Sequence, residues 1–481
     1  MLIELRIFAS GRNGPSLGGK GPSFALGLAL VFAGSVFGQD KAQPTAVSSA
    51  WTKPAWLTDL SLGVKESYDD NLLLVSGKDP GLSLQSSWIT TVSPKLGFNF
   101  APLLGKESAF QTLSLAYAPD FVVYNDASSE SYNAHKIANV IKGKTGDFSF
   151  SVDNAFLFND GNTAVPNYAL NQGSDAAGQY DKNRSSFSTA APRERRKQIQ
   201  DRAAVVFQYD IDKFFVRPIA SLLYYDLMTD WHNASVAPYK GCQNYADRAD
   251  VSGGLDFGYK VVTNLAVTVG YRYGHQYQQA LPNSVESLTV NGQHAQSSSD
   301  YQRFLVGLEG KPWSWLTAKL LGGPDFRDYN ADAPVDNHQP IDYYAEVFLV
   351  AALTSKQSLG FTYRHGRWMS SNGKLPSADS VCGLTYHWNA TKQLGIDLTA
   401  RYADSDYTVG STDKTLKASL RNDGMYSFSA GVSYAFTSHF SASLGYAYDI
   451  GNNEMDQMVG SPPGYRNFDH QLVSLGAQYK F

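Results

Sequence analysis

The feature that most constrains the fold of this chain is a strict alternation of apolar and polar side chains in many separate segments. Alternation with a period of two residues places successive side chains on opposite faces of a β-strand. About eighteen such segments follow one another from Leu57 to the end, and no amphipathic helical pattern interrupts them. The clearest are "LAVTVGYRY" (Leu265–Tyr273), "LGFTYRH" (Leu359–His365), "GIDLTARY" (Gly395–Tyr402), "YSFSAGVSYAF" (Tyr426–Phe436) and "FSASLGYAY" (Phe440–Tyr448). The sequence therefore predicts an all-β chain.

The connections between these segments alternate between short and long. Short links lie at 144–147, 262–264, 354–357, 389–393 and 436–440, and long polar stretches at 159–198, 229–247, 279–300, 329–341, 369–379, 404–424 and 450–467. This order puts all tight turns at one end of an antiparallel meander, as in outer-membrane barrels with short periplasmic turns and long extracellular loops. We predict a single transmembrane antiparallel up-and-down β-barrel over residues 57–481, with the last strand pairing with the first near Leu60–Tyr68.

Aromatic residues support a membrane barrel over a soluble β-sandwich, which also shows alternation. The chain has 29 Tyr and 26 Phe, and many lie near the predicted strand ends, such as Tyr271 and Tyr446 at the long-loop side and Trp313 and Phe436 at the short-turn side. Two girdles of amphipathic rings suit the two interfaces of a membrane. Charged residues make up 17% of the chain, below the roughly 25% of an average soluble domain.

The first 38 residues are typical of a signal peptide. An apolar run, Phe24–Phe37, follows Arg6, Arg12 and Lys20 and ends in small residues near Gly38. The alternative is a single amino-terminal membrane anchor, although the run is shorter than a full span. We expect residues 39–56 to form a periplasmic linker and the mature chain to lie in the bacterial outer membrane, in contact with its lipids.

Charged residues on the polar faces of the strands cannot face lipid, because Lys or Arg at the bilayer midplane costs roughly 2–4 kcal/mol. We predict that they line the lumen. They either line an aqueous pore or form ion pairs that stiffen the wall, and the first reading does not exclude the second. The predicted lumenal residues are Lys65, Lys95, Arg202, Lys260, Arg272, Arg303, Lys319, Arg364, Arg401, Asp256, Glu309 and Asp397.

Three other features leave alternatives open. The segment "RERRKQ" (Arg193–Gln198) is either a solvated loop end, which we favour, or a contact for anionic headgroups or a polyanionic solute. Asp69, Asp70 and Asn71 form a turn, the favoured reading, or hold Ca²⁺. Cys242 and Cys382 are one loop thiol and one strand thiol, or one disulfide.

No catalytic or cofactor motif appears in the sequence. There is no nucleophile with an adjacent base, no H-E-x-x-H and no glycine-rich phosphate loop, so we expect neither an enzyme nor a cofactor or metal. The net charge of −4 argues against a nucleic-acid partner.

Two segments, "LGVKESYDDNLLL" near the start and "LGAQYKF" at the end, resemble the outer-membrane β-barrel porins of diderm bacteria. This resemblance covers the layout of the mature chain and implies a passive channel. It also implies that Tyr479 and Phe481 form the signal read by the barrel-assembly machinery.

The sequence thus predicts an outer-membrane channel for passive diffusion of small hydrophilic solutes. An exporter of anionic exopolysaccharide and a non-conducting barrel acting as adhesin or anchor remain alternatives, and the oligomeric state is left open.

Overall fold

The computed structural model of the chain describes most of the region after residue 52. The described residues are 53–72, 74, 84–105, 107–161, 198–226, 247–279, 289–290, 293–294, 296–369, 376–407, 409–410, 421–455 and 467–481. The predicted signal peptide, most of the predicted linker, the cationic stretch 193–197 and Cys242 lie outside these residues. Of the two cysteines, Cys382 is described and is a free thiol.

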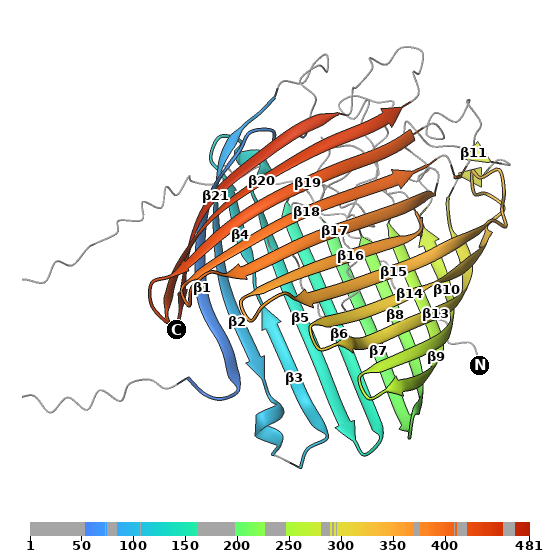
Figure 1. The fold of residues 1–481 in the computed structure, drawn as a ribbon. Helices are drawn as coiled ribbons and strands as arrows, with labels where there is room; N and C mark the ends of the chain where they lie inside the picture. The colour runs from blue at the N-terminus through green and yellow to red at the C-terminus, as the bar shows by residue number, and fades with distance from the viewer. Residues whose placement is uncertain are drawn as a thin grey trace, which may run out of the picture. The chain divides into compact units, whose positions relative to one another are not determined.

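The described chain forms a closed antiparallel barrel of 18 strands, as predicted (Figure 1). Its strands are β1 (Leu57–Asp69), β2 (Ser87–Asn99), β3 (Phe110–Tyr117), β4 (Asp120–Tyr124), β5 (Tyr132–Thr145), β6 (Phe148–Gly161), β7 (Gln198–Ile211), β8 (Phe214–Asp226), β9 (Arg248–Val262), β10 (Leu265–Gln278), β13 (Ser299–Trp313), β14 (Leu316–Tyr329), β15 (Ile341–Ala352), β16 (Gln357–Trp368), β17 (Ser377–Asn389), β18 (Leu394–Asp406), β19 (Arg421–Ala435), β20 (Phe440–Met455) and β21 (Phe468–Lys480). Two 3₁₀ turns, η1 (Ala101–Leu104) and η2 (Ser128–Glu130), and a two-stranded ribbon, β11 (Thr289–Val290) and β12 (Gln293–His294), lie in connections.

The strands β3 and β4 occupy one position in the wall, so nineteen strand segments make eighteen positions. Both pair with β2 on one side and β5 on the other, without a change of register. The break falls at Ala118 and Pro119. Proline has no N–H to donate to a neighbouring strand, which accounts for the interruption.

The barrel closes by pairing of its first and last strands. Antiparallel pairing of β1 with β21 runs from Ser61 opposite Lys480 to Asp69 opposite Leu472. This confirms the predicted pairing of the last strand with the first. Closure matters because it leaves no unpaired strand edge, which the interior of a bilayer does not tolerate.

The two faces of the wall differ as the alternation predicts. Residues directly opposite on neighbouring strands share a face, so the register can be followed around the barrel. Large apolar side chains are exposed on one face, for example Val269 at 58%, Val306 at 62% and Leu475 at 61%. Their sequence neighbours face inward. Among the described residues, no helix is long and apolar enough to span a membrane.

The short turns are built from residues that tolerate a left-handed backbone. Gly146, between β5 and β6, has φ of 57°, and Asp212, between β7 and β8, has φ of 55°. Glycine and aspartate are favoured at such positions in tight hairpins. Aromatic rings cluster at this end of the barrel, where Trp313 stacks on Trp315 at 5.7 Å between ring centroids and Phe436 packs on Phe440 at 5.5 Å.

Candidate functional site

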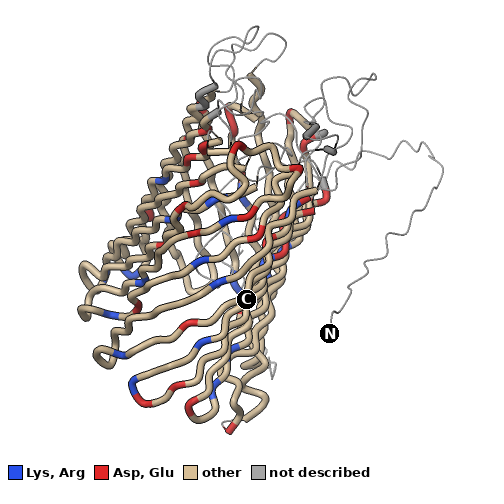
Figure 2. Tube along the Cα trace, turned by 90° about the vertical axis from the view of Figure 1, so that its right-hand side faces the viewer, with Lys and Arg blue, Asp and Glu red and all other residues tan. Residues whose placement is uncertain are grey.

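The register places all the predicted lumenal residues on the inner face of the wall. Direct cross-strand pairs join several of them, including Arg272 with Arg303 and Glu309 with Lys319. Their role as pore-lining residues stays a prediction. Figure 2 shows Lys and Arg interspersed with Asp and Glu along the strands rather than separated into regions of one sign. The inner face as a whole therefore carries both charges.

One group of ion pairs joins four neighbouring strands. Arg217 of β8 makes two hydrogen bonds of 2.9 Å with the carboxylate of Glu309 on β13, and its Nε lies 3.3 Å from Asp256 of β9. The other carboxylate oxygen of Asp256 lies 2.7 Å from Nη1 of Arg272 on β10. Two-pronged arginine–carboxylate pairs of this kind are stronger and more directional than single contacts. The positive charges here are neutralised within the wall.

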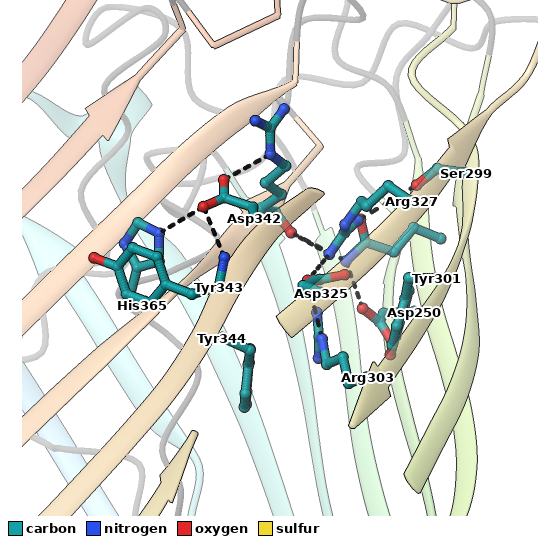
Figure 3. Close-up of polar contacts among 12 residues, drawn as sticks. Asp250, Ser299, Tyr301, Arg303, Asp325, Arg327, Asp342, Tyr343, Tyr344 and His365 are labelled. Carbon is teal, nitrogen blue, oxygen red and sulfur yellow. Dashed lines mark hydrogen bonds and ion pairs between the residues drawn. The ribbon is translucent and has the colours of Figure 1, made fainter. Parts of the chain in front are cut away.

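A second group, nearer the long-loop end, is fully buried. Asp325 accepts from Arg303 Nε and from Arg327 Nη2, both at 3.0 Å, and its own side chain has 0% exposure (Figure 3). The guanidinium of Arg303 lies between two tyrosine rings, 4.1 Å from the centroid of Tyr301 and 4.0 Å from that of Tyr344. A cation between aromatic faces is attracted by both rings.

Two further polar side chains extend this group. Asp250 accepts from the Tyr301 hydroxyl at 2.9 Å and from the Gln276 amide at 2.7 Å. Gln276 in turn accepts from Arg327 Nη1 at 2.5 Å. We call these residues the arginine network: Asp250, Gln276, Tyr301, Arg303, Asp325, Arg327 and Tyr344.

The end of β16 stays paired with β17 but pairs with β15 only as far as His365, and its backbone contacts this network. The carbonyl oxygen of Arg367 accepts from Arg327 at 2.9 Å and from Gln276 at 3.4 Å, and that of Met369 accepts from Arg248 at 3.3 Å. We call residues Arg367–Met369 the lumenal strap. It is tied to three strands, β9, β10 and β14, none of which pairs with β16.

The side chain of Trp368 anchors the strap to a more distant part of the wall. It packs in a buried cluster with Leu223 and Tyr225 of β8, and its own exposure is 3%. Because β8 and β16 are not neighbours, this contact crosses part of the lumen. The structure thus narrows the lumen between β8 and β16 with residues that the described chain itself supplies.

A different surface lines the inner face of β19, β20 and β21. Its consecutive inward positions carry small or uncharged side chains, and we call it the serine–glycine patch: Ser427, Ser429, Gly431, Ser433, Ser441, Ser443, Gly445, Ala447, Ser474, Gly476 and Gln478. Serines lie opposite glycines across the strands, as Ser443 does with Gly476 and Ser474 with Gly445. None of its six serine hydroxyls makes a hydrogen bond to the described part of the chain.

The patch ends in a buried cluster at the long-loop side. His470 bridges two carboxylates, with Nε2 3.2 Å from Asp69 and Nδ1 3.0 Å from Asp449. Asp69 also accepts from the backbone N–H of Asn71 at 3.0 Å, a geometry that supports the turn interpretation of this segment. Among the described residues, no group of three or more His, Cys, Asp or Glu could hold a metal ion.

Sequence reasoning missed several residues of these groups, namely Arg217, Arg248, Asp250, Asp325, Arg327 and Trp368. A signal for one pair was present, because Asp325 and Arg327 are two residues apart in "DFRDY" and so share a face of β14. The contacts of the strap with β8, β9, β10 and β14 had no such signal. Trp368 reads as one more aromatic residue at a strand end.

Comparisons with known proteins give similarity of architecture only. No protein-family model matches the chain, and no curated protein matches it. Among solved structures, the chain is similar to OccK2 (OpdF) of Pseudomonas aeruginosa in complex with glucuronate, with 8% identity, a TM-score of 0.41, and 88% of this chain and 98% of that chain covered.

Two further solved structures are similar to the same degree. The outer membrane protein OpdK of Pseudomonas aeruginosa has 10% identity and a TM-score of 0.40, with 88% of this chain and 99% of that chain covered. The ferric citrate transporter FecA in its unliganded form has 10% identity and a TM-score of 0.40, with 89% and 79% covered. These likenesses assign no solute to the chain.

Proposed function

We propose that this protein is an outer-membrane channel for passive diffusion of small hydrophilic solutes. The observation that carries the proposal is the combination of a closed 18-strand barrel, an apolar outer face and an inner face with solvent-accessible polar side chains. A barrel of this strand number is wide enough to enclose water, whereas an eight-stranded barrel fills with its own side chains. Water in the lumen gives small polar solutes a route across the membrane.

The location in the outer membrane is part of this proposal. It is supported by the closed barrel and by the exposed rings at the short-turn end, where Tyr479 and Phe481 pack together at 4.9 Å between centroids. Export by a cleaved signal peptide at residues 1–38 and reading of Tyr479 and Phe481 by the barrel-assembly machinery stay predictions. Replacing Phe481 by Ala and measuring the fraction of heat-modifiable barrel in outer-membrane preparations tests the second.

Conductance across a planar lipid bilayer tests the proposed function directly. Purified, refolded protein is expected to give stepwise current increases at moderate voltage. A correctly folded barrel, shown by strand content and heat-modifiable migration, that gives no steps would contradict the proposal. Boiled protein from the same preparation is the control for channels from contaminants.

A second candidate, a non-conducting barrel that serves as an adhesin or anchor, is favoured by one observation. The strap and the buried arginine network fill part of the lumen between β8 and β16. Absence of current from folded protein would favour it. The exopolysaccharide exporter is less favoured, because five of the nine inward cations that suggested it lie within ion pairs: Lys95, Lys260, Arg272, Arg303 and Arg364.

A further inference from the structure

The outer face of the wall carries polar side chains at one place in the middle of its height. Asn139 of β5 and Asn154 of β6 lie directly opposite each other, on the same face as the exposed ring of Phe207. Each is the middle outward residue of its strand, with three outward positions before it and three after it. The middle outward residues of β9 and β13, Leu255 and Val306, are apolar instead.

This position lies at the depth of the lipid tails. A strand of 14 residues such as β6 spans roughly 35 Å when tilted by about 40°. The apolar band of an outer-membrane barrel is about 25 Å tall, so the middle of such a strand falls well inside it. The two asparagines therefore face hydrocarbon if nothing covers them.

The asparagines are joined to a carboxylate on the next strand, and we call Asn139, Asn154 and Asp201 the outer polar row. Asn139 Nδ2 donates to Asn154 Oδ1 at 3.3 Å, and Asn154 Nδ2 donates to Asp201 Oδ1 at 2.6 Å. Within the described part of the chain, Asn139 and Asp201 make no other side-chain hydrogen bond. One N–H and the carbonyl oxygen of Asn139, and one oxygen of Asp201, are thus left for a partner outside this barrel.

Lipid tails cannot be that partner, because they offer neither donors nor acceptors. Water is absent at this depth as well, and a polar group without a partner in hydrocarbon costs several kcal/mol. Polar side chains that face out of a membrane protein at this depth are used to bind other protein segments. The outer polar row is therefore a surface for another protein.

We propose that the outer polar row is the surface on which a second copy of this chain docks within the membrane. The carboxamide of Asn139 has both an unused donor and an unused acceptor. Two copies related by a two-fold axis close a reciprocal pair, in which each Asn139 donates to the carbonyl oxygen of the other. The proposal requires that the barrel lies in a bilayer, and it does not depend on whether the barrel conducts.

Small residues beside the row suit the close approach of a second wall. Ala203 of β7 lies opposite Asn154, and Ala220 of β8 lies opposite Gly253 of β9, all on the outer face. A Cβ added to Gly253 would have the carbonyl oxygen of Ile219 as its nearest neighbour, at 3.9 Å, so the space above it is open. Small residues at contacts within a membrane allow two backbones to come close enough for polar side chains to meet.

The fraction of dimer in lipid vesicles tests the proposal. Purified chain labelled with a donor or an acceptor fluorophore is expected to show energy transfer between copies. Replacing the row together, Asn139→Leu, Asn154→Leu and Asp201→Leu, should lower the dimer fraction several-fold at the same ratio of protein to lipid. The matched control is Glu66→Leu, which removes an outward carboxylate from β1, on the face shared with the exposed Leu475. The control should leave the dimer fraction unchanged.

Cross-linking keeps the test independent of any folding loss in the triple variant, because it leaves the row intact. In a chain with Cys242→Ser and Cys382→Ser, Ile141→Cys places a thiol on the next outward position of β5 after Asn139. A short bis-maleimide should join two such chains into a product of twice the chain mass. Val306→Cys, in the middle of the outer face of β13, is the control and should stay monomeric.

Three results would overturn the proposal: a monomeric wild type, a triple variant that folds and dimerises as the wild type does, or equal cross-linking of the two thiols. Cross-linking of Ile141→Cys in bacterial membranes to a chain of another mass would show that a different protein covers the row, which also overturns it. Neither experiment measures conductance, so failure of this proposal leaves the channel function as it stands.

Discussion

The arginine network and the serine–glycine patch face the same lumen and belong to the same sheet, yet they are built in opposite ways. In the network, Asp325 is fully buried and every charged group is engaged by a partner or a ring. In the patch, Ser443 and Ser433 are exposed and make no hydrogen bond within the described chain. Long charged side chains need many contacts to be stable away from water, whereas short hydroxyls can be left to water.

The difference teaches that polar residues on the inner face have two separate roles. Those of the network stabilise the wall and the strap, because breaking any one contact leaves a buried charge. Those of the patch make no hydrogen bond within the described chain, so we expect them to contribute little to stability. Substitutions in the two regions should therefore change different quantities.

The largest expected effect is a loss in the free energy of unfolding caused by Asp325→Ala. Removing this carboxylate leaves Arg303 and Arg327 buried without their shared counter-ion, and loss of one partner of a buried ion pair costs about 3–5 kcal/mol. The free energy of unfolding can be measured by urea titration in lipid vesicles, followed by tryptophan fluorescence. Ser443→Ala is the control from the patch and should change this free energy by less than about 0.5 kcal/mol. Equal effects of the two substitutions would remove the distinction between the regions.

The second-largest effect is expected from Trp368→Ala, which should change both the free energy of unfolding and the conductance. Loss of a large aromatic side chain from a buried cluster costs about 3 kcal/mol or more. The same change frees the strap from Leu223 and Tyr225. Single-channel conductance should therefore rise. Trp315→Ala is the control, since that ring is 49% exposed at the short-turn end and does not contact the strap. Unchanged conductance with Trp368→Ala would show that the strap does not limit the current.

The barrel and the lumenal strap were not equally predictable from the sequence. The barrel, its strand number and its closing pair follow from alternation and from the order of short and long links, because both are local properties of the chain. The inward face of Arg303, Lys319 or Arg401 follows from the same period of two. The contacts of the strap do not, because Trp368 meets β8 only once the five strands between β8 and β16, namely β9, β10, β13, β14 and β15, have been placed in three dimensions. Which arginine pairs with which carboxylate likewise depends on register across several strands.

A third, smaller effect is expected at the buried end of the patch, from His470→Ala. The imidazole lies between Asp69 and Asp449, and without it two buried carboxylates lose their shared partner. An unsatisfied buried polar group costs about 1–3 kcal/mol. Because β1 and β21 form the closing seam, we expect this loss as a lower denaturant midpoint and not as a change in conductance. His439→Ala, in the exposed short turn between β19 and β20, is the control. A change in single-channel conductance with normal stability would instead place His470 in the solute path.

The smallest effect is expected from the pair between His387 and Asp397, which lies on the inner face at the short-turn end. The two side chains are joined at 2.7 Å but are 41% and 55% exposed. Exposed ion pairs contribute about 0.2–1 kcal/mol, since water competes for both partners and holding two side chains together costs entropy. His387→Ala should therefore leave the denaturant midpoint nearly unchanged, in contrast to Asp325→Ala on the same face. A loss above about 2 kcal/mol would mean that water does not reach this part of the lumen. The change in denaturant midpoint caused by His387→Ala therefore reports whether water reaches this part of the lumen. The proposed channel function requires that it does.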